Sequence, residues 1–121
     1  MKKKIDSKKY IKKLNSALTQ EVNKNIEKLA VSLNDAWKNN KNIFLCGNGG
    51  SAANAMHIAN DLIYGAGVKK GKGLKAEALS SNSSVLTCLA NDIGYENIFL
   101  EQLKVKASNG DILIVLSGSG N

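Results

Sequence analysis

The stretch IFLCGNGGSAANAMHIAND, residues 43–61, decides how this chain folds. It opens with a short apolar run, passes through a cluster of glycines, and continues as a segment rich in alanine and other helix-compatible residues. This order predicts a strand over residues 43–46, a tight loop, and a helix from Ser51 to about Tyr64, with Ser51 as a plausible N-cap. A strand that leads through a glycine loop into a helix is typical of α/β folds.

The chain downstream repeats the alternation of apolar strands and helices. The predicted elements are a glycine- and lysine-rich loop over residues 65–73, strands over 76–79 and 111–116, and helices over 83–90 and 95–107. Strands that are continuous apolar runs separated by helices indicate a parallel sheet covered on both faces. We therefore predict the α/β class with a doubly wound parallel sheet.

A helical arm precedes this sheet. The apolar positions from Val22 to Trp37 recur at the i, i+3, i+4 spacing of one helix face, which suits packing on a core or on another subunit. We expect an arm over residues 1–40 and an α/β domain over residues 41–121. Because three strands make a thin sheet, we expect the second region to be the first part of a longer domain.

The charge of the chain is concentrated at its N-terminus. The 121 residues include 17 basic and 10 acidic ones, for a formal net charge of +7, and residues 1–13 hold seven lysines and one aspartate. Every basic residue is a lysine. The chain therefore lacks arginine, whose guanidinium group makes paired hydrogen bonds to bases and to phosphates. We expect a solvated basic face with weak, non-specific attraction to polyanions and no specific nucleic-acid partner.

Hydropathy and cysteine usage indicate a cytoplasmic protein. The apolar runs fall far short of the about 20 residues that a membrane span needs, and the charged N-terminus lacks the apolar core of a signal peptide. We expect no membrane partner. Cys46 and Cys88 lie in apolar contexts without a CxxC spacing, so we expect two buried, reduced thiols.

The glycine loop predicts an anion site. Residues 47–52 fit the G-x-G-x-x-[GA] pattern of dinucleotide sites, but the acidic residue expected about 20 positions later is missing. Asp61 comes too early, inside the helix, and Glu77 lies within the next strand. Glycines still allow close approach of a ligand, and N–H groups at a helix start favour an anion. With the hydroxyl of Ser51, the loop suits a phosphate or a sugar hydroxyl.

A second loop has the same composition. LSGSGN, residues 116–121, follows an apolar strand and contains Ser117, Gly118 and Ser119. The carboxyl ends of parallel strands meet at one edge of a sheet, where open α/β sheets bind ligands. We therefore expect one phosphorylated small molecule held from both loops. No lysine follows either glycine cluster in the Walker position, which argues against a P-loop NTPase.

Three motifs carry a resemblance to a known family. CGNGGSAANAMHIAND, LTCLANDIGYENIF and GDILIVLSGSGN resemble the sugar isomerase (SIS) domain family, and within it most closely the phosphoheptose isomerases. Those enzymes convert sedoheptulose 7-phosphate to D-glycero-D-manno-heptose 7-phosphate. The resemblance implies a flavodoxin-like fold, a homotetramer assembled through the N-terminal helices, and a role in making heptose for lipopolysaccharide or capsule.

The resemblance also implies functions for individual residues. Those implied to contact the substrate are Asn48, Gly49, Gly50, Ser51, Asn91, Asp92, Ser117, Gly118 and Ser119. His57 is implied to ligate zinc, and Asp61 is implied to serve both the metal and the acid/base step. Isomerisation through an enediol needs a base and an acid, and two ligands at i and i+4 share one helix face.

The sequence departs from the family pattern at several places. Asp61 replaces a glutamate, Gly118 replaces a threonine, and the family's later glutamine and histidine fall beyond residue 121. We therefore expect residues 1–121 alone to lack isomerase activity, and a non-catalytic phosphosugar-binding or regulatory protein stays open as the alternative.

Structural readings of the same residues also stay open. His57 could be a structural residue, Asp61 a surface or intersubunit hydrogen bonder, and Asp92 the N-cap of the helix that starts near Tyr95. We interpret the aromatic residues Trp37, Tyr64 and Tyr95 as packing residues.

Overall fold

The structure is a computed structural model that describes residues 6–65 and 71–120. The chain forms two compact units, residues 1–32 and residues 33–121, each with its own contacts. No helix in the described part of the chain is long and apolar enough to cross a membrane. Part of the predicted loop over residues 65–73 lies outside the described residues.

The predicted helical arm consists of two helices. In the first, α1 (Ser7–Ala17), the carboxylate of Asp6 caps the N-terminus by accepting from the Lys9 N–H at 3.1 Å. The second, α2 (Gln20–Lys38), starts after Thr19, whose hydroxyl accepts from the Val22 N–H at 3.2 Å. A hydroxyl in this position satisfies one of the unpaired donors at a helix start, so the chain begins a new helix here.

The last turn of α2 belongs to the second unit and ends in a reversal of the chain. Asn40 takes a left-handed conformation with φ 56°. Its N–H donates to the Trp37 carbonyl at 3.2 Å, and the Lys41 N–H donates to the Ala36 carbonyl at 2.8 Å. This pair of bonds is the Schellman motif, which ends helices and turns the chain toward the next element.

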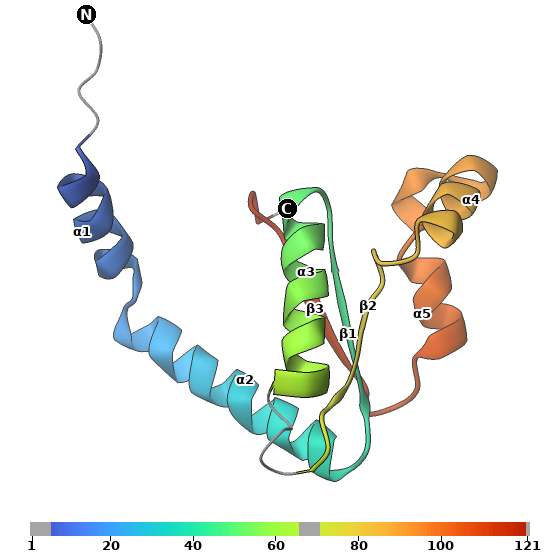
Figure 1. The fold of residues 1–121 in the computed structure, drawn as a ribbon, viewed down its shortest axis with the longest axis horizontal. Coiled ribbons are helices and arrows are strands. Elements are labelled where there is room, and N and C mark those ends of the chain that lie inside the picture. The colour runs from blue at the N-terminus through green and yellow to red at the C-terminus, as the bar shows by residue number, and fades with distance from the viewer. Residues whose placement is uncertain (1–5, 66–70, 121) are drawn as a thin grey trace, which may run out of the picture. The chain divides into compact units, whose positions relative to one another are not determined.

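The sheet has three parallel strands, as the sequence predicts. They are β1 (Asn42–Gly47), β2 (Lys75–Ala78) and β3 (Ile112–Leu116), in the order β2-β1-β3 (Figure 1). Phe44 in β1 pairs with Glu77 on one side and Leu113 on the other. The α/β fold with a parallel sheet is therefore confirmed, and all three strands end at the same edge.

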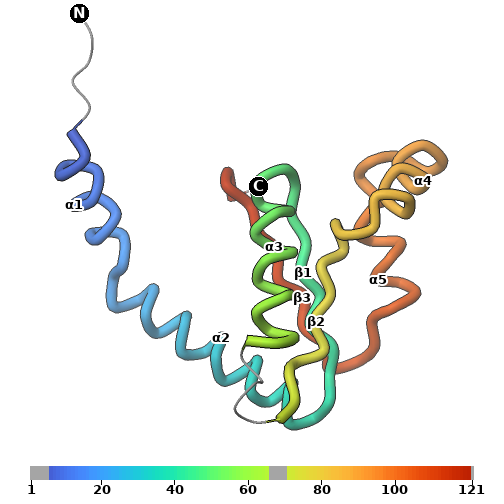
Figure 2. The backbone as a smooth tube through the Cα atoms, in the orientation of Figure 1, coloured from blue at the N-terminus to red at the C-terminus, as the bar shows by residue number. Residues whose placement is uncertain are grey.

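The helix α3 (Gly50–Asn60) covers one face of this sheet, and Figure 2 shows it running alongside the strands. Its buried residues are Ala55 and Ala59, which pack with Ile43 and Leu45 of β1. Both of these strand residues are completely buried. Small side chains on the helix let its backbone lie close to the strand, so that the larger strand residues fill the core.

The segment 95–106 covers the other face at β1. The predicted helix over residues 95–107 is divided into a 3₁₀ turn, η3 (Tyr95–Asn97), and α5 (Leu100–Lys106). Phe99 and Leu103 from this segment pack on a buried cluster of Phe44, Cys46 and Leu79. The outward residues of β3, Leu113 and Val115, are 46% and 63% exposed, so helices cover both faces at the central strand but not at β3.

A buried glutamine fastens α5 to the sheet. The amide nitrogen of Gln102 donates to the carbonyl of Leu79 at 3.0 Å and to that of Ile98 at 2.9 Å. The side chain is only 5% exposed, and its amide oxygen accepts from Lys106 at 3.2 Å. Because each polar atom is paired, burying this side chain carries little desolvation cost.

Two local predictions need correction. The helix α3 starts one residue before Ser51, because Gly49, with φ 54°, occupies the cap position, and after Asn60 the chain continues as a π-helix, η1 (Asp61–Gly65). Cys88, predicted to be buried, is exposed on α4 (Ser83–Ile93). Cys46 is buried as expected, and burial raises the pKa of its thiol.

Asp111 joins the starts of β1 and β3. Its carboxylate accepts from the backbone N–H of Asn42 at 2.8 Å, from the Asn42 side-chain amide at 3.1 Å, and from the Ser108 N–H at 2.9 Å. These hydrogen bonds favour the charged form, so they lower the pKa of the Asp111 carboxyl below its ordinary value.

We predict that Asp111→Ala lowers the free energy of unfolding by about 1–3 kcal/mol, because it leaves the partly buried Asn42 N–H without its acceptor. The lowered pKa means that the carboxylate stabilises the fold fully above the unfolded pKa of about 4. The difference from wild type should shrink as the pH falls through the folded pKa. Urea unfolding from pH 7 to pH 3 measures it.

Asp35→Ala is the matched control, since Asp35 is exposed on α2 and its carboxylate has no hydrogen bond in the described structure. An Asp111→Ala protein as stable as this control at pH 7 would contradict the prediction.

Candidate functional site

The loop after β1 brings backbone donors to the edge of the sheet. The strand ends at Gly47, and Asn48 and Gly49 lead directly into α3. The carbonyl of Asn48 accepts from the Ser51 N–H at 3.0 Å, while no side chain caps the helix start. A helix N-terminus without a side-chain cap leaves donors that suit an anion.

Gly47 is the point where β1, α3 and β3 meet. A Cβ at this position would lie 2.8 Å from the Cβ of Ser51 and 2.9 Å from the carbonyl oxygen of Leu116. By contrast, a Cβ on Gly49, Gly50 or Gly118 would meet nothing within 4 Å. The first glycine is therefore required by packing, and the others leave open space in front of the loops.

A cavity of about 340 Å³ opens between the two glycine- and serine-containing loops. Its lining residues are Cys46, Gly47, Asn48, Ser51, Phe99, Val115, Leu116, Ser117, Gly118 and Ser119. The structure therefore brings together five of the residues predicted for the substrate site, from both loops. It also adds Phe99, which no sequence pattern placed there and which supplies an apolar wall.

The second loop folds back on itself. The hydroxyl of Ser117 accepts from the Gly120 N–H at 3.0 Å and lies 3.4 Å from the hydroxyl of Ser119. Both serine side chains are exposed at the carboxyl end of β3. This arrangement places two hydroxyls next to each other on the cavity, which suits the several acceptor oxygens of a phosphate group.

Tyr95 reaches the first loop from the turn that follows α4. Its hydroxyl donates to the side-chain oxygen of Asn48 at 2.8 Å, across 47 positions of sequence. Ser80, just after β2, adds a hydroxyl that donates to the Gly47 carbonyl at 3.3 Å. Tyr95 is 60% exposed, so its interpretation as a packing residue is wrong, as it is for the 73% exposed Tyr64.

His57 and Asp61 form a pair on the helix that follows the loop. The Nε2 of His57 lies 3.5 Å from a carboxylate oxygen of Asp61, and the two side chains are 76% and 61% exposed. Neither lines the cavity. Within residues 6–65 and 71–120, no group of three histidine, cysteine, aspartate or glutamate side chains could hold a metal ion. The pair fits two positions of a tetrahedral zinc site.

Asn91 and Asp92 lie near the end of α4 and pair with each other. The Asn91 amide donates to one carboxylate oxygen of Asp92 at 2.9 Å, and the Cys88 thiol lies 3.5 Å from the other. The hydrogen bond to Asp92 and its negative charge raise the pKa of the Cys88 thiol. Asp92 lies inside α4, and Gly94 precedes η3, so Asp92 is not the cap of the next segment. Neither residue lines the cavity.

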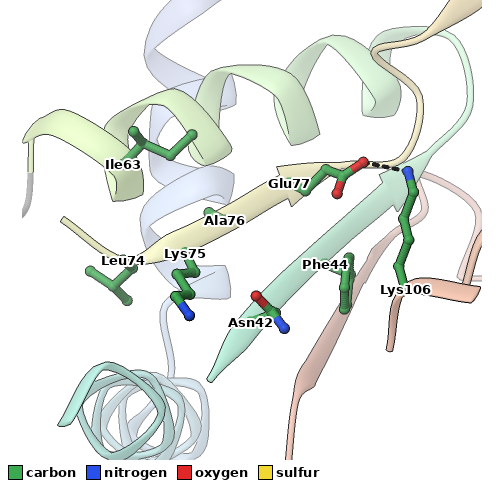
Figure 3. Close-up of a pocket in the computed structure, with 8 residues that line it drawn as sticks. All are labelled: Asn42, Phe44, Ile63, Leu74, Lys75, Ala76, Glu77 and Lys106. Atoms are coloured by element: carbon green, nitrogen blue, oxygen red, sulfur yellow. Dashed lines mark hydrogen bonds and ion pairs between the residues drawn. The ribbon is translucent and has the colours of Figure 1, made fainter. Parts of the chain in front are cut away.

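A second pocket lies elsewhere on the sheet, against β2, and contains none of the predicted site residues. Figure 3 shows Glu77 and Lys106 pointing toward each other across it, in an ion pair of 2.5 Å. This pair connects β2 to α5 and needs no ligand to account for it. The cavity between the two loops is therefore the candidate site.

Comparison with known proteins identifies the family of the chain. A family model described as the SIS domain matches residues 8–121. The chain belongs to the SIS domain family. Several relatives of this SIS chain are named phosphoheptose isomerase. One from a Nitratiruptor species is 50% identical over 86 residues, which are 71% of this chain and 46% of the relative. One from Helicobacter pylori is 41% identical over 114 residues, which are 94% of this chain and 55% of the relative.

A solved structure shows the same likeness. The phosphoheptose isomerase GmhA from Neisseria gonorrhoeae superposes with a TM-score of 0.67 at 36% identity, covering 77% of this chain and 47% of that one. A phosphoheptose isomerase from Francisella tularensis, at 24% identity and a TM-score of 0.69, covers 93% of this chain and 62% of that one and shares the fold. The predicted family resemblance is confirmed. The SIS chain spans about half the length of the curated relatives it matches.

We predict that Gly47→Ala in this SIS chain lowers the free energy of unfolding by about 1–3 kcal/mol, because the added methyl group meets backbone atoms that cannot move aside. Gly118→Ala is the matched control, because its methyl group enters open space. Denaturant unfolding of both variants measures the difference, and equal midpoints would contradict the packing argument.

Proposed function

We propose that the protein containing this chain is a sugar-phosphate ketose–aldose isomerase that converts sedoheptulose 7-phosphate to D-glycero-D-manno-heptose 7-phosphate. The observation that carries the proposal is the cavity between the two loops, which Asn48 and Ser51 line from one side and Ser117 and Ser119 from the other. The relatives named phosphoheptose isomerase support the choice of reaction.

The two loops divide the ligand between them. The hydroxyls of Ser117 and Ser119, next to each other at the end of β3, suit the phosphate. Asn48, Ser51 and the donors at the start of α3 suit sugar oxygens, with Gly49 and Gly50 allowing close approach. Asn91 and Asp92 belong to the proposed site as further sugar contacts.

The proposed reaction moves one proton between neighbouring carbons. The carboxylate of Asp61 takes the proton from the carbon beside the carbonyl, which gives an enediolate. A proton passes from the hydroxyl oxygen on that carbon to the former carbonyl oxygen, and the Asp61 carboxylic acid returns its proton to the former carbonyl carbon. His57 and Asp61, 3.5 Å apart on one helix face, are the proposed protein ligands of zinc. When bound, zinc would polarise the substrate carbonyl.

A homotetramer in the cytoplasm is part of the proposal. In the first unit, apolar side chains of α1, of α2 and of the two residues between them are exposed: Tyr10, Ile11, Leu14, Leu18, Val22, Ile26 and Leu29. An apolar helix face of this length normally packs on another surface. We assign these helices to contacts between subunits, and the product to the heptose of lipopolysaccharide or capsule.

We predict that His57→Ala in the full-length protein lowers kcat/KM for sedoheptulose 7-phosphate by about a hundredfold or more and removes bound zinc. Asn60→Ala is the matched control, because Asn60 is an exposed neighbour on α3 that does not line the cavity. Turnover and zinc content are measured together on the same preparations.

Different results separate the alternatives. A full-length protein that binds sedoheptulose 7-phosphate with zinc present but does not convert it would replace the isomerase with a regulatory phosphosugar-binding protein. Asp61→Glu, which lengthens the carboxylate by one methylene, would retain activity if the carboxylate acts as proposed, whereas Asp61→Asn would not.

We predict that Ile26→Asp converts the full-length tetramer to smaller species, because it introduces a charge into the apolar face of α2. Lys24→Asp, two positions away and so on the opposite side of the helix, should leave the mass unchanged. Light scattering coupled to gel filtration measures the mass, and a tetrameric Ile26→Asp protein would exclude this face as the interface.

A further inference from the structure

Tyr95 is a polar contact of the ligand loop that the reaction described above does not use. The residue follows Gly94, which has a φ of 93° and ends α4, so the chain turns sharply before the aromatic side chain. Its hydroxyl donates to the side-chain oxygen of Asn48 at 2.8 Å. The residue is 60% exposed, so burial does not explain its position.

This hydrogen bond holds the Asn48 side chain, with its amide oxygen toward Tyr95. An asparagine side chain has an oxygen that accepts and a nitrogen that donates, and the two ends look alike in shape. Because the phenol proton is given to the Asn48 oxygen, the amide nitrogen is the end left for other partners. In the described part of the chain that nitrogen has no hydrogen-bond partner, and Asn48 lines the cavity.

The hydrogen bond matters because Asn48 is exposed and its side chain has no other hydrogen bond in the described structure. A side chain that must be ordered when a ligand binds costs conformational free energy at that moment, whereas one held beforehand does not. The backbone of the loop is held separately, by the Ser80 hydroxyl on the Gly47 carbonyl and by the packing around Gly47. Tyr95 acts on the side chain alone.

We propose that Tyr95 is a positioning residue for sugar-phosphate binding, holding the Asn48 amide so that its NH₂ group donates to an oxygen of the ligand in the cavity. The proposal rests on the proposed function, because it takes a sugar phosphate as the ligand. It adds a residue from the α4–η3 junction to a site otherwise built from the two loops.

The test is a double-mutant cycle in the full-length protein with Tyr95→Phe, Asn48→Ala and the two combined. Tyr95→Phe keeps the ring and removes only the hydroxyl, so the affinity for sedoheptulose 7-phosphate should fall by about threefold to tenfold, the effect of one neutral hydrogen bond. KM should rise while kcat stays nearly unchanged, because the contact serves binding in ground and transition state alike.

The combined variant separates positioning from an independent effect. If Tyr95 acts through Asn48, then Tyr95→Phe should have no further effect once Asn48 is alanine. Tyr64→Phe is the matched control, since Tyr64 is 73% exposed and its hydroxyl has no partner in the described structure. The unfolding midpoint of Tyr95→Phe should fall by no more than the loss of one exposed hydrogen bond causes, and by the same amount as that of Asn48→Ala, whereas a merely structural role would predict a larger fall.

Each failure has its own signature. Tyr95→Phe with wild-type affinity, or with an effect that adds fully to Asn48→Ala, would overturn the positioning role while the isomerase proposal stands. A wild-type protein that binds no sedoheptulose 7-phosphate would overturn the proposed function and this inference together.

Discussion

The burial of β1 on both faces is the constraint on which the rest of this structure depends. Ile43 to Cys46 are four consecutive buried side chains, and β1 is paired on both edges with parallel strands. A strand buried in this way needs a helix layer on each face, and parallel pairing needs a crossover between successive strands. The helices α3 and α5 meet both needs, and the crossovers bring all strand ends to one edge.

The candidate site follows from that arrangement. The loops after β1 and β3 leave neighbouring strands at the same edge of the sheet. Their serines and glycines therefore line one cavity, and no further element is needed to bring them together. Tyr95 reaches the same place because α4 and the turn at Gly94 return the chain toward the first loop. His57 and Asp61 are placed differently, four positions apart where α3 continues into η1.

Patterns over a few residues predicted most of the fold but not its breaks. The strands and their parallel pairing follow from apolar runs separated by helices, and the structure has them within one or two residues. The start of a new helix after Leu18 depends on the Thr19 hydroxyl, which caps α2. The division of the predicted helix near Phe99 into η3 and α5 depends on packing against β1. Ser51 is the preferred residue type for a cap, but the left-handed Gly49 takes that position.

The site was predictable only where its residues are close in sequence. Serines and glycines directly after strands identified both loops, whereas the partner of Asn48 is a tyrosine 47 positions away that no local pattern connects to it. The assignments of Asn91 and Asp92 came from family resemblance, and in this structure their polar atoms bind each other. Distance along the chain, rather than chemistry, limited what the sequence could predict.

The packing at Gly47 has a consequence for how ligand preference could change. Because a Cβ on this residue would meet Ser51 and the Leu116 carbonyl, the close approach of β1, α3 and β3 at this point depends on the glycine. Substitutions at other positions around the cavity can change which groups point at a ligand without adding an atom at this contact. Selection for a new sugar would therefore act on lining positions such as Phe99 and Gly118 rather than on Gly47.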